Sequence, residues 1–136
     1  MARLNHIAVL VANLDEAMKL FNEVWGIQPS DILTLEHQGI RTASYEFENV
    51  KVELMEPSSP DSVVAKSLEK RGPSIHHIAV EVDDVRQRMQ ALKAMGLQFT
   101  TDEPSEGIHG TTICFLHPKS TFGILTELVQ PPKGHQ

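Results

Sequence analysis

Two short stretches of the chain alternate between small or polar residues and branched apolar residues. They cover residues 6–11 and 77–82, and the second follows the first by 77 − 6 = 71 positions. A period of two predicts a strand with two different faces. After each stretch, apolar residues recur at helical spacing, in residues 14–25 and again from about 85 to 92. We therefore expect a strand followed by a helix, twice.

Helix boundaries are marked by residues that favour caps. Asn13 with Glu16 predicts the start of the first helix and Gly26 its end, while Gly96 ends the second helix. Segments rich in β-forming residues follow each helix. They are residues 32–37, 40–47 and 50–55 in the first half, and 97–100, 111–116 and 124–129 in the second. The predicted order is β-α-β-β-β, twice.

These elements define an α+β protein made of two repeated βαβββ modules. Module one covers about residues 3–57 and module two about residues 74–131. Between them, Asp61 or Ser62 can cap a short linker helix over about residues 61–71. At 136 residues with 40% hydrophobic residues, the chain is long enough for one core that both modules share. We expect one domain over residues 1–136.

Composition excludes several classes of protein. A formal net charge of −6 argues against a general nucleic-acid binder, which would carry a basic face. One cysteine, Cys114, excludes an intramolecular disulfide and a thiolate-rich zinc site, and its apolar strand predicts an inert core thiol. No apolar run approaches the length of a membrane span, and the N-terminus lacks a signal-peptide core. We expect a soluble, cytoplasmic protein without nucleic-acid or membrane partners.

The repeat also carries matched pairs of metal-ligand types. His6 corresponds to His77, and Glu53 corresponds to Glu127 at a displacement of 127 − 53 = 74. His76 lies next to His77 and points to the other face of the strand, so only His77 matches His6. If the two modules face each other, the four side chains form a mixed nitrogen and oxygen site for a divalent metal. The plainer interpretation is that the histidines are half-buried sheet residues and the glutamates solvated ones.

The chain resembles the methylmalonyl-CoA epimerase family of the vicinal oxygen chelate superfamily. The resemblance covers nearly the whole chain, and its closing block is more like the epimerases than the glyoxalases. The blocks that carry it are Asn5-His6-Ile7-Ala8-Val9, residues 52–57 with Ser59-Pro60-Asp61-Ser62, residues 75–83, and Phe115-Leu116-His117-Pro118-Lys119-Ser120 leading into residues 123–128.

The resemblance implies a glyoxalase-like fold, in which the modules curl a mixed sheet around a metal-binding cleft, and a homodimer. It places His6, Glu53, His77 and Glu127 on the metal-ligand positions, with Glu127 also as a base. The implied reaction interconverts the 2-epimers of an acyl-CoA substrate, methylmalonyl-CoA, by α-proton abstraction through a metal-stabilised enolate. Cobalt, zinc, nickel, manganese or iron suits such ligands. The alternatives are another metal-dependent isomerase, such as a lactoylglutathione lyase, and a non-catalytic small-molecule-binding module.

Two further residues bear on the substrate. Lys119 is a candidate contact for a CoA phosphate. Some relatives carry a glutamate, proposed as a second catalytic base, three residues after a Gln-Gly turn, whereas this chain has Thr42 after Gln38-Gly39. Threonine cannot act as that base, and Glu46, on the same strand face, is roughly 13 Å further along. The sequence therefore leaves the second acid unassigned.

Overall fold

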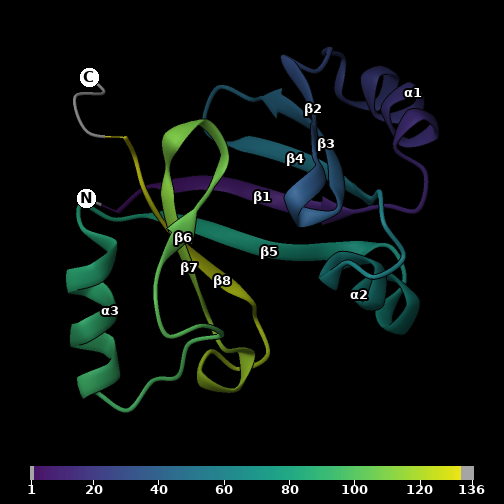
Figure 1. Ribbon diagram of the computed structural model, residues 1–136. Coiled ribbons are helices and arrows are strands. Elements are labelled where there is room, and N and C mark those ends of the chain that lie inside the picture. The colour runs from purple at the N-terminus through teal and green to yellow at the C-terminus, as the bar shows by residue number, and fades with distance from the viewer. Residues whose placement is uncertain (1, 133–136) are drawn as a thin grey trace. The chain divides into compact units, whose positions relative to one another are not determined.

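The computed structural model describes residues 2–132, and it divides into two compact units. One unit is His6–His76, and the other consists of Met1–Asn5 with His77–Gln136. The predicted domain also includes residues 1 and 133–136, which lie outside the described residues. The first unit contains β1 (Leu4–Leu10, which begins two residues before it), α1 (Leu14–Trp25), β2 (Asp31–Leu35), the 3-10 turn η1 (Glu36–Gln38), β3 (Ile40–Glu46), β4 (Lys51–Pro57) and α2 (Val63–Arg71) (Figure 1).

The strands of the first unit are ordered β2-β3-β4-β1. β1 and β4 are parallel, and the β2/β3 and β3/β4 pairs are antiparallel. One face of this sheet packs against α1 through the buried residues Val11, Leu14, Ala43, Tyr45 and Leu54. On the opposite face, Ala8, Leu10, Ile40 and Met55 pack with Val64 of α2. Because α2 covers only this apolar part, the polar residues of the same face remain available for chemistry.

The predicted helix caps of this unit are confirmed. The side chain of Asn13 accepts a hydrogen bond of 3.0 Å from the backbone amide of Glu16, and α1 ends at Gly26 in the left-handed conformation. Of the two candidate caps for the linker helix, Ser62 caps α2, and its hydroxyl accepts from the Ala65 amide at 3.1 Å. Short polar side chains at these positions satisfy amides that a helix start leaves unpaired.

The second unit repeats the order of the first. Its elements are β5 (Ser74–Glu81, which begins three residues before His77), α3 (Val85–Ala94), β6 (Ser105–Glu106), the 3-10 turn η2 (Ile108–Gly110), β7 (Thr112–Leu116), the 3-10 turn η3 (Pro118–Ser120) and β8 (Thr126–Gln130). The strand order is β5-β8-β7-β6, with β5 and β8 parallel and β7 antiparallel to β8. α3 packs one face through Val82, Val85, Met89, Cys114, Leu116 and Leu128. The two predicted βαβββ modules are confirmed.

The predicted strand at residues 97–100 is wrong. Only a single bridge, between Phe99 and Leu116, forms there, and β6 lies instead at Ser105–Glu106. Phe99 is partly buried against the α3 core, so its side chain is held by packing instead of a continuous ladder. The chain then turns, with the Thr101 hydroxyl donating to the Glu103 carbonyl at 2.8 Å. The apolar residues that suggested a strand in this segment therefore pack against the α3 core and do not form one.

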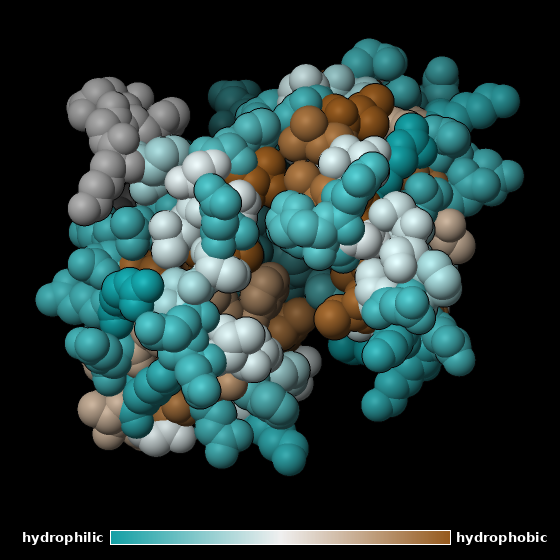
Figure 2. Space-filling model, in the orientation of Figure 1, coloured by the Kyte–Doolittle hydropathy of each residue, from teal (hydrophilic) through white to brown (hydrophobic). Residues whose placement is uncertain are grey.

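The surface view is largely hydrophilic, with scattered apolar patches (Figure 2). Among the described residues, the most exposed large apolar side chains are Val63, Met95 and Phe122. Within residues 2–132, none of the helices is both long enough and apolar enough to cross a membrane.

Candidate metal centre

The first unit brings His6 and Glu53 together on one face of its sheet. His6 lies on β1 and Glu53 on the parallel strand β4, and each is 7% exposed. The register places Ala8, two residues after His6, opposite Glu53. The small alanine leaves room for the carboxylate to turn toward the imidazole, and His6 Nε2 lies 3.7 Å from Glu53 Oε1. A buried carboxylate requires a partner of this kind.

The second unit repeats this arrangement with His77 and Glu127. His77 lies on β5 and Glu127 on the parallel strand β8, with Ala79 opposite Glu127. The histidine and glutamate are 7% and 5% exposed, and His77 Nε2 lies 2.9 Å from Glu127 Oε1. The Phe115 ring meets the imidazole edge-to-face at 5.1 Å between centroids, which restricts its orientation. In each unit, therefore, an alanine two residues after the histidine faces the glutamate.

The two pairs fit the chemistry of a divalent metal. An ion bound at about 2.1 Å from each of two ligand atoms places those atoms roughly 3 to 3.4 Å apart. The distances of 3.7 Å for His6–Glu53 and 2.9 Å for His77–Glu127 lie close to this range on either side. Only the shorter one is also a hydrogen-bond distance. His6, His77 and Glu127 alone supply two imidazoles and a carboxylate, a buried donor set that could hold a metal ion.

The other residues singled out from the sequence lie apart from these pairs. Lys119 is exposed in η3, where its amide donates to His117 Nδ1 at 3.1 Å. Glu46 is exposed at the end of β3, whereas Thr42 is 1% exposed. Cys114 is a buried thiol, as predicted, and its pKa is raised to about 11, first by burial and then by the negative charge of Glu127.

Ser44 is a polar residue of the first unit that sequence reasoning missed. It is 8% exposed and lies directly opposite Glu53 in the β3/β4 register. Directly opposite residues of an antiparallel pair project from the same face. Its position two residues after Thr42 was visible in the sequence, but its pairing with Glu53 depends on the register.

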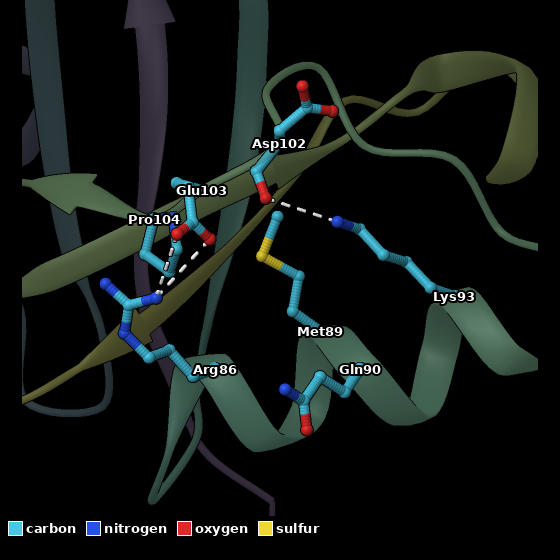
Figure 3. Close-up of a pocket in the computed structure, with 7 residues that line it drawn as sticks. All are labelled: Arg86, Met89, Gln90, Lys93, Asp102, Glu103 and Pro104. Carbon is cyan, nitrogen blue, oxygen red and sulfur yellow. Dashed lines mark hydrogen bonds and ion pairs between the residues drawn. The ribbon is translucent and has the colours of Figure 1, made fainter.

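A surface pocket of about 120 Å³ lies in the second unit (Figure 3), and neither His77 nor Glu127 lines it. It is formed by α3 and residues 102–104, and includes Met89 of the core on the α3 face of the sheet. Its cationic groups bind neighbouring protein atoms: Arg86 pairs with Glu103 at 3.4 Å, and Lys93 donates to the Asp102 carbonyl at 3.2 Å. It offers no metal-ligand pair of the kind described above.

Comparison with known proteins identifies the family. Residues 5–115 match the family model of the Glyoxalase/Bleomycin resistance protein/Dioxygenase superfamily. The chain belongs to this superfamily. Members of the superfamily typically bind a divalent metal, in agreement with the donor set of His6, His77 and Glu127. The predicted glyoxalase-like fold class is confirmed.

Within the superfamily, the chain belongs with the methylmalonyl-CoA epimerases. It is 38% identical to the mitochondrial methylmalonyl-CoA epimerase of Dictyostelium discoideum, over 93% of this chain and 76% of that protein. It is 35% identical to the ethylmalonyl-CoA/methylmalonyl-CoA epimerase of Cereibacter sphaeroides, over 94% of this chain and 97% of that protein. A solved methylmalonyl-CoA epimerase in complex with methylmalonyl-CoA and ammonium is 32% identical, with a TM-score of 0.88 over 98% of this chain and 96% of that one.

Proposed function

We propose that this protein is a metal-dependent epimerase that interconverts the 2-epimers of methylmalonyl-CoA. The observation that carries the proposal is the repeated pair of buried side chains, His6–Glu53 and His77–Glu127, in a chain of the epimerase family. Burying charged groups costs stability, so packing of the core does not explain two buried histidine–carboxylate pairs in equivalent places. A bound cation would offset this cost.

We propose that His6, Glu53, His77 and Glu127 together hold one divalent ion. Each histidine already presents Nε2 to a carboxylate oxygen, so the ligand atoms face each other within each pair. Cobalt, zinc, nickel, manganese and iron all accept imidazole and carboxylate ligands. When bound, such an ion supplies positive charge that offsets the negative charge developing on the thioester oxygen as the C2 proton leaves.

Glu127 is the proposed base. Its carboxylate takes the proton from C2, so that the C–H bond breaks, an O–H bond forms, and the electron pair moves toward the thioester carbonyl. Its burial at 5% exposed surface keeps bulk water from competing for the proton. His77 Nε2 lies 2.9 Å from Glu127 Oε1, so a metal ion that both side chains bind would hold the carboxylate beside the imidazole.

The CoA portion of the substrate is proposed to contact Lys119. The exposed ammonium of this residue can pair with a phosphate, and the hydrogen bond from the Lys119 amide to His117 Nδ1 fixes the turn that carries it. In Lys119→Ala we expect the Michaelis constant for the CoA substrate to rise several-fold. The control is Lys93→Ala, which removes a lysine from the α3 pocket. An unchanged Michaelis constant in Lys119→Ala would remove this assignment.

The decisive experiment follows exchange at C2. The protein, with its metal content measured, is incubated with each epimer of methylmalonyl-CoA in deuterium oxide. We expect both epimers to interconvert and to acquire deuterium at C2. In Glu127→Gln the rate should fall by about 10²–10⁴-fold, the range that a general base contributes. Turnover of the glutathione hemithioacetal of methylglyoxal instead would identify the lactoylglutathione lyase alternative, and binding of either compound without exchange would identify a binding module.

A further inference from the structure

We propose that Phe122 binds the adenine base of the CoA substrate, with the base stacked on the exposed phenylalanine ring and a phosphate paired with Lys119. This inference rests on the proposed function and deepens it, because it names the residue that recognises the nucleotide end of the substrate. The residues that carry it lie on the turn between β7 and β8, within the second unit.

Phe122 is an aromatic residue that neither burial nor backbone conformation explains. It is 100% exposed, and its φ of +56° lies in the left-handed region, which is unfavourable for a bulky side chain. Glycine is the usual residue in this conformation at the end of a helical turn. Phe122 therefore costs stability without contributing to the core. A conformational outlier of this kind is typical of functional sites.

Backbone hydrogen bonds hold this turn closed. The Pro118 carbonyl accepts from the amide of Thr121 at 3.1 Å and from the amide of Gly123 at 2.8 Å. A bond from the sixth residue back to the first is typical of the Schellman motif, in which the fifth residue is left-handed, and here that residue is Phe122. The ring is thus presented to solvent on a backbone that is already ordered, so a ligand that binds it does not have to order the loop.

The charge of this turn suits a phosphate. Residues 117–125 contain Lys119 and no acidic residue, although the whole chain has a formal net charge of −6. Lys119 is exposed, and within residues 2–132 its ammonium has no hydrogen-bond or ion-pair partner. His117 adds a donor: because its Nδ1 accepts from the Lys119 amide, the neutral ring carries its proton on Nε2. An exposed ring beside a cation matches an adenine nucleotide, since the base can stack on the ring while a phosphate pairs with the cation.

The turn also lies within reach of the proposed base in the same unit. Glu127, the second residue of β8, follows Phe122 by 127 − 122 = 5 residues, and five extended residues span at most about 18 Å. The amide of Ile78 donates to the Leu125 carbonyl at 3.3 Å, which holds the end of the turn beside β5. In CoA thioesters a long pantetheine arm separates the thioester from the nucleotide. A thioester at Glu127 and a base at Phe122 agree with that arrangement.

The first test measures binding of CoA itself by isothermal titration. In Phe122→Gly we expect the dissociation constant to rise at least about fivefold, the lower end of what a base gains by stacking on an aromatic ring. Phe122→Tyr keeps the ring and should bind as the unaltered protein does. The matched control is Met95→Ala, which removes a side chain of the same unit that is 72% exposed. Equal affinity in Phe122→Gly, or no binding of CoA to the unaltered protein, would overturn the assignment.

The second test separates recognition of the nucleotide from catalysis. KM and kcat are measured with methylmalonyl-CoA and with methylmalonyl-pantetheine, which lacks the nucleotide. In Phe122→Gly we expect KM for the CoA thioester to rise at least about fivefold with kcat unchanged, and both constants for the pantetheine thioester to stay the same. A fall in kcat with both substrates would mean that the turn acts through Glu127, and would overturn the assignment. If the unaltered protein turns over neither substrate, the proposed function fails, whereas the CoA titration still decides on Phe122.

Melting temperature and mass test whether the ring has a packing role instead. Glycine adopts the left-handed conformation without a clash, so the melting temperature of Phe122→Gly should stay the same or rise. Its mass by light scattering should equal that of the unaltered protein. A lower melting temperature or a changed mass would show that the ring packs against this chain or a second copy of it, and would overturn the proposal.

Discussion

Neighbouring residues on one strand can have unrelated roles, as His76 and His77 on β5 show. His77 is 7% exposed and faces Glu127, whereas His76 is half-buried on the other face. The direction of the side chain, set by the alternation of the strand, therefore decides which imidazole can bind a metal.

This difference gives a paired prediction. His77→Ala removes a proposed ligand and leaves Glu127 as a buried carboxylate without its imidazole, so metal affinity should fall by at least tenfold. His76→Ala should retain the affinity of the unaltered protein. Isothermal titration with zinc or cobalt measures both. Equal affinity in the two variants would contradict the assignment of His77.

Cys114 provides a prediction on pH at the same scale. Its pKa is raised from 9.0 to about 11, chiefly by burial. The folded state therefore favours the neutral thiol, and its stability contribution is fully present below pH about 9 and lost as the pH rises through about 11. We expect the free energy of unfolding to fall more steeply across this interval than in Cys114→Ala. Urea titrations of both proteins at pH 8, 9, 10 and 11 test this, and parallel curves would show that Cys114 does not contribute.

At the scale of elements, the turn before β3 depends on a close contact with the start of α2. Gly39 follows η1 with a φ of +65°, and a Cβ there would lie 2.7 Å from Cβ of Ser62, which caps α2. The backbone conformation favours glycine, and the contact leaves no room for a side chain. The turn at Gly39 therefore packs directly against the start of α2 at Ser62.

Gly39→Ala should destabilise the protein by more than the roughly 1–2 kcal/mol that a left-handed alanine costs by itself. Gly26→Ala is the matched control, because Gly26 has the same left-handed backbone conformation, with a φ of +70°, but nothing within 4 Å of the added Cβ. Denaturant unfolding of both variants measures the difference. If the two lose equal stability, the Ser62 contact does not constrain the turn.

At the scale of the whole molecule, binding of a metal to the folded state must stabilise that state. With free metal at 100 times the dissociation constant, the gain is about 2.7 kcal/mol, which corresponds to roughly 5–10 °C in melting temperature for a chain of this size. Calorimetry of chelator-treated and metal-loaded protein measures it. We expect the shift to disappear in His77→Ala and to persist in His76→Ala. No shift in the unaltered protein would contradict a metal held by the folded chain.

Assembly is the other property of the whole molecule that the family resemblance predicts. A homodimer of this 15.1 kDa chain has a mass of 2 × 15.1, or about 30 kDa. Light scattering coupled to size-exclusion chromatography distinguishes it from a monomer. The cytoplasmic location likewise stays a prediction, which fractionation of cells that produce the protein can test.

The two βαβββ modules, the cap at Asn13 and the four ligand candidates could be predicted from the sequence alone, because period, capping chemistry and internal repetition are local or can be read by comparing two segments. The sequence offered Asp61 and Ser62 as caps of the linker helix, and the structure selected Ser62. The sequence also placed His77 ahead of His76. Only the tertiary structure showed that an alanine faces each glutamate and that Ser44 lies opposite Glu53, because strand register depends on pairing between distant segments. For the same reason the segment at residues 97–100, β-forming in composition, is held by the α3 core and makes only one bridge.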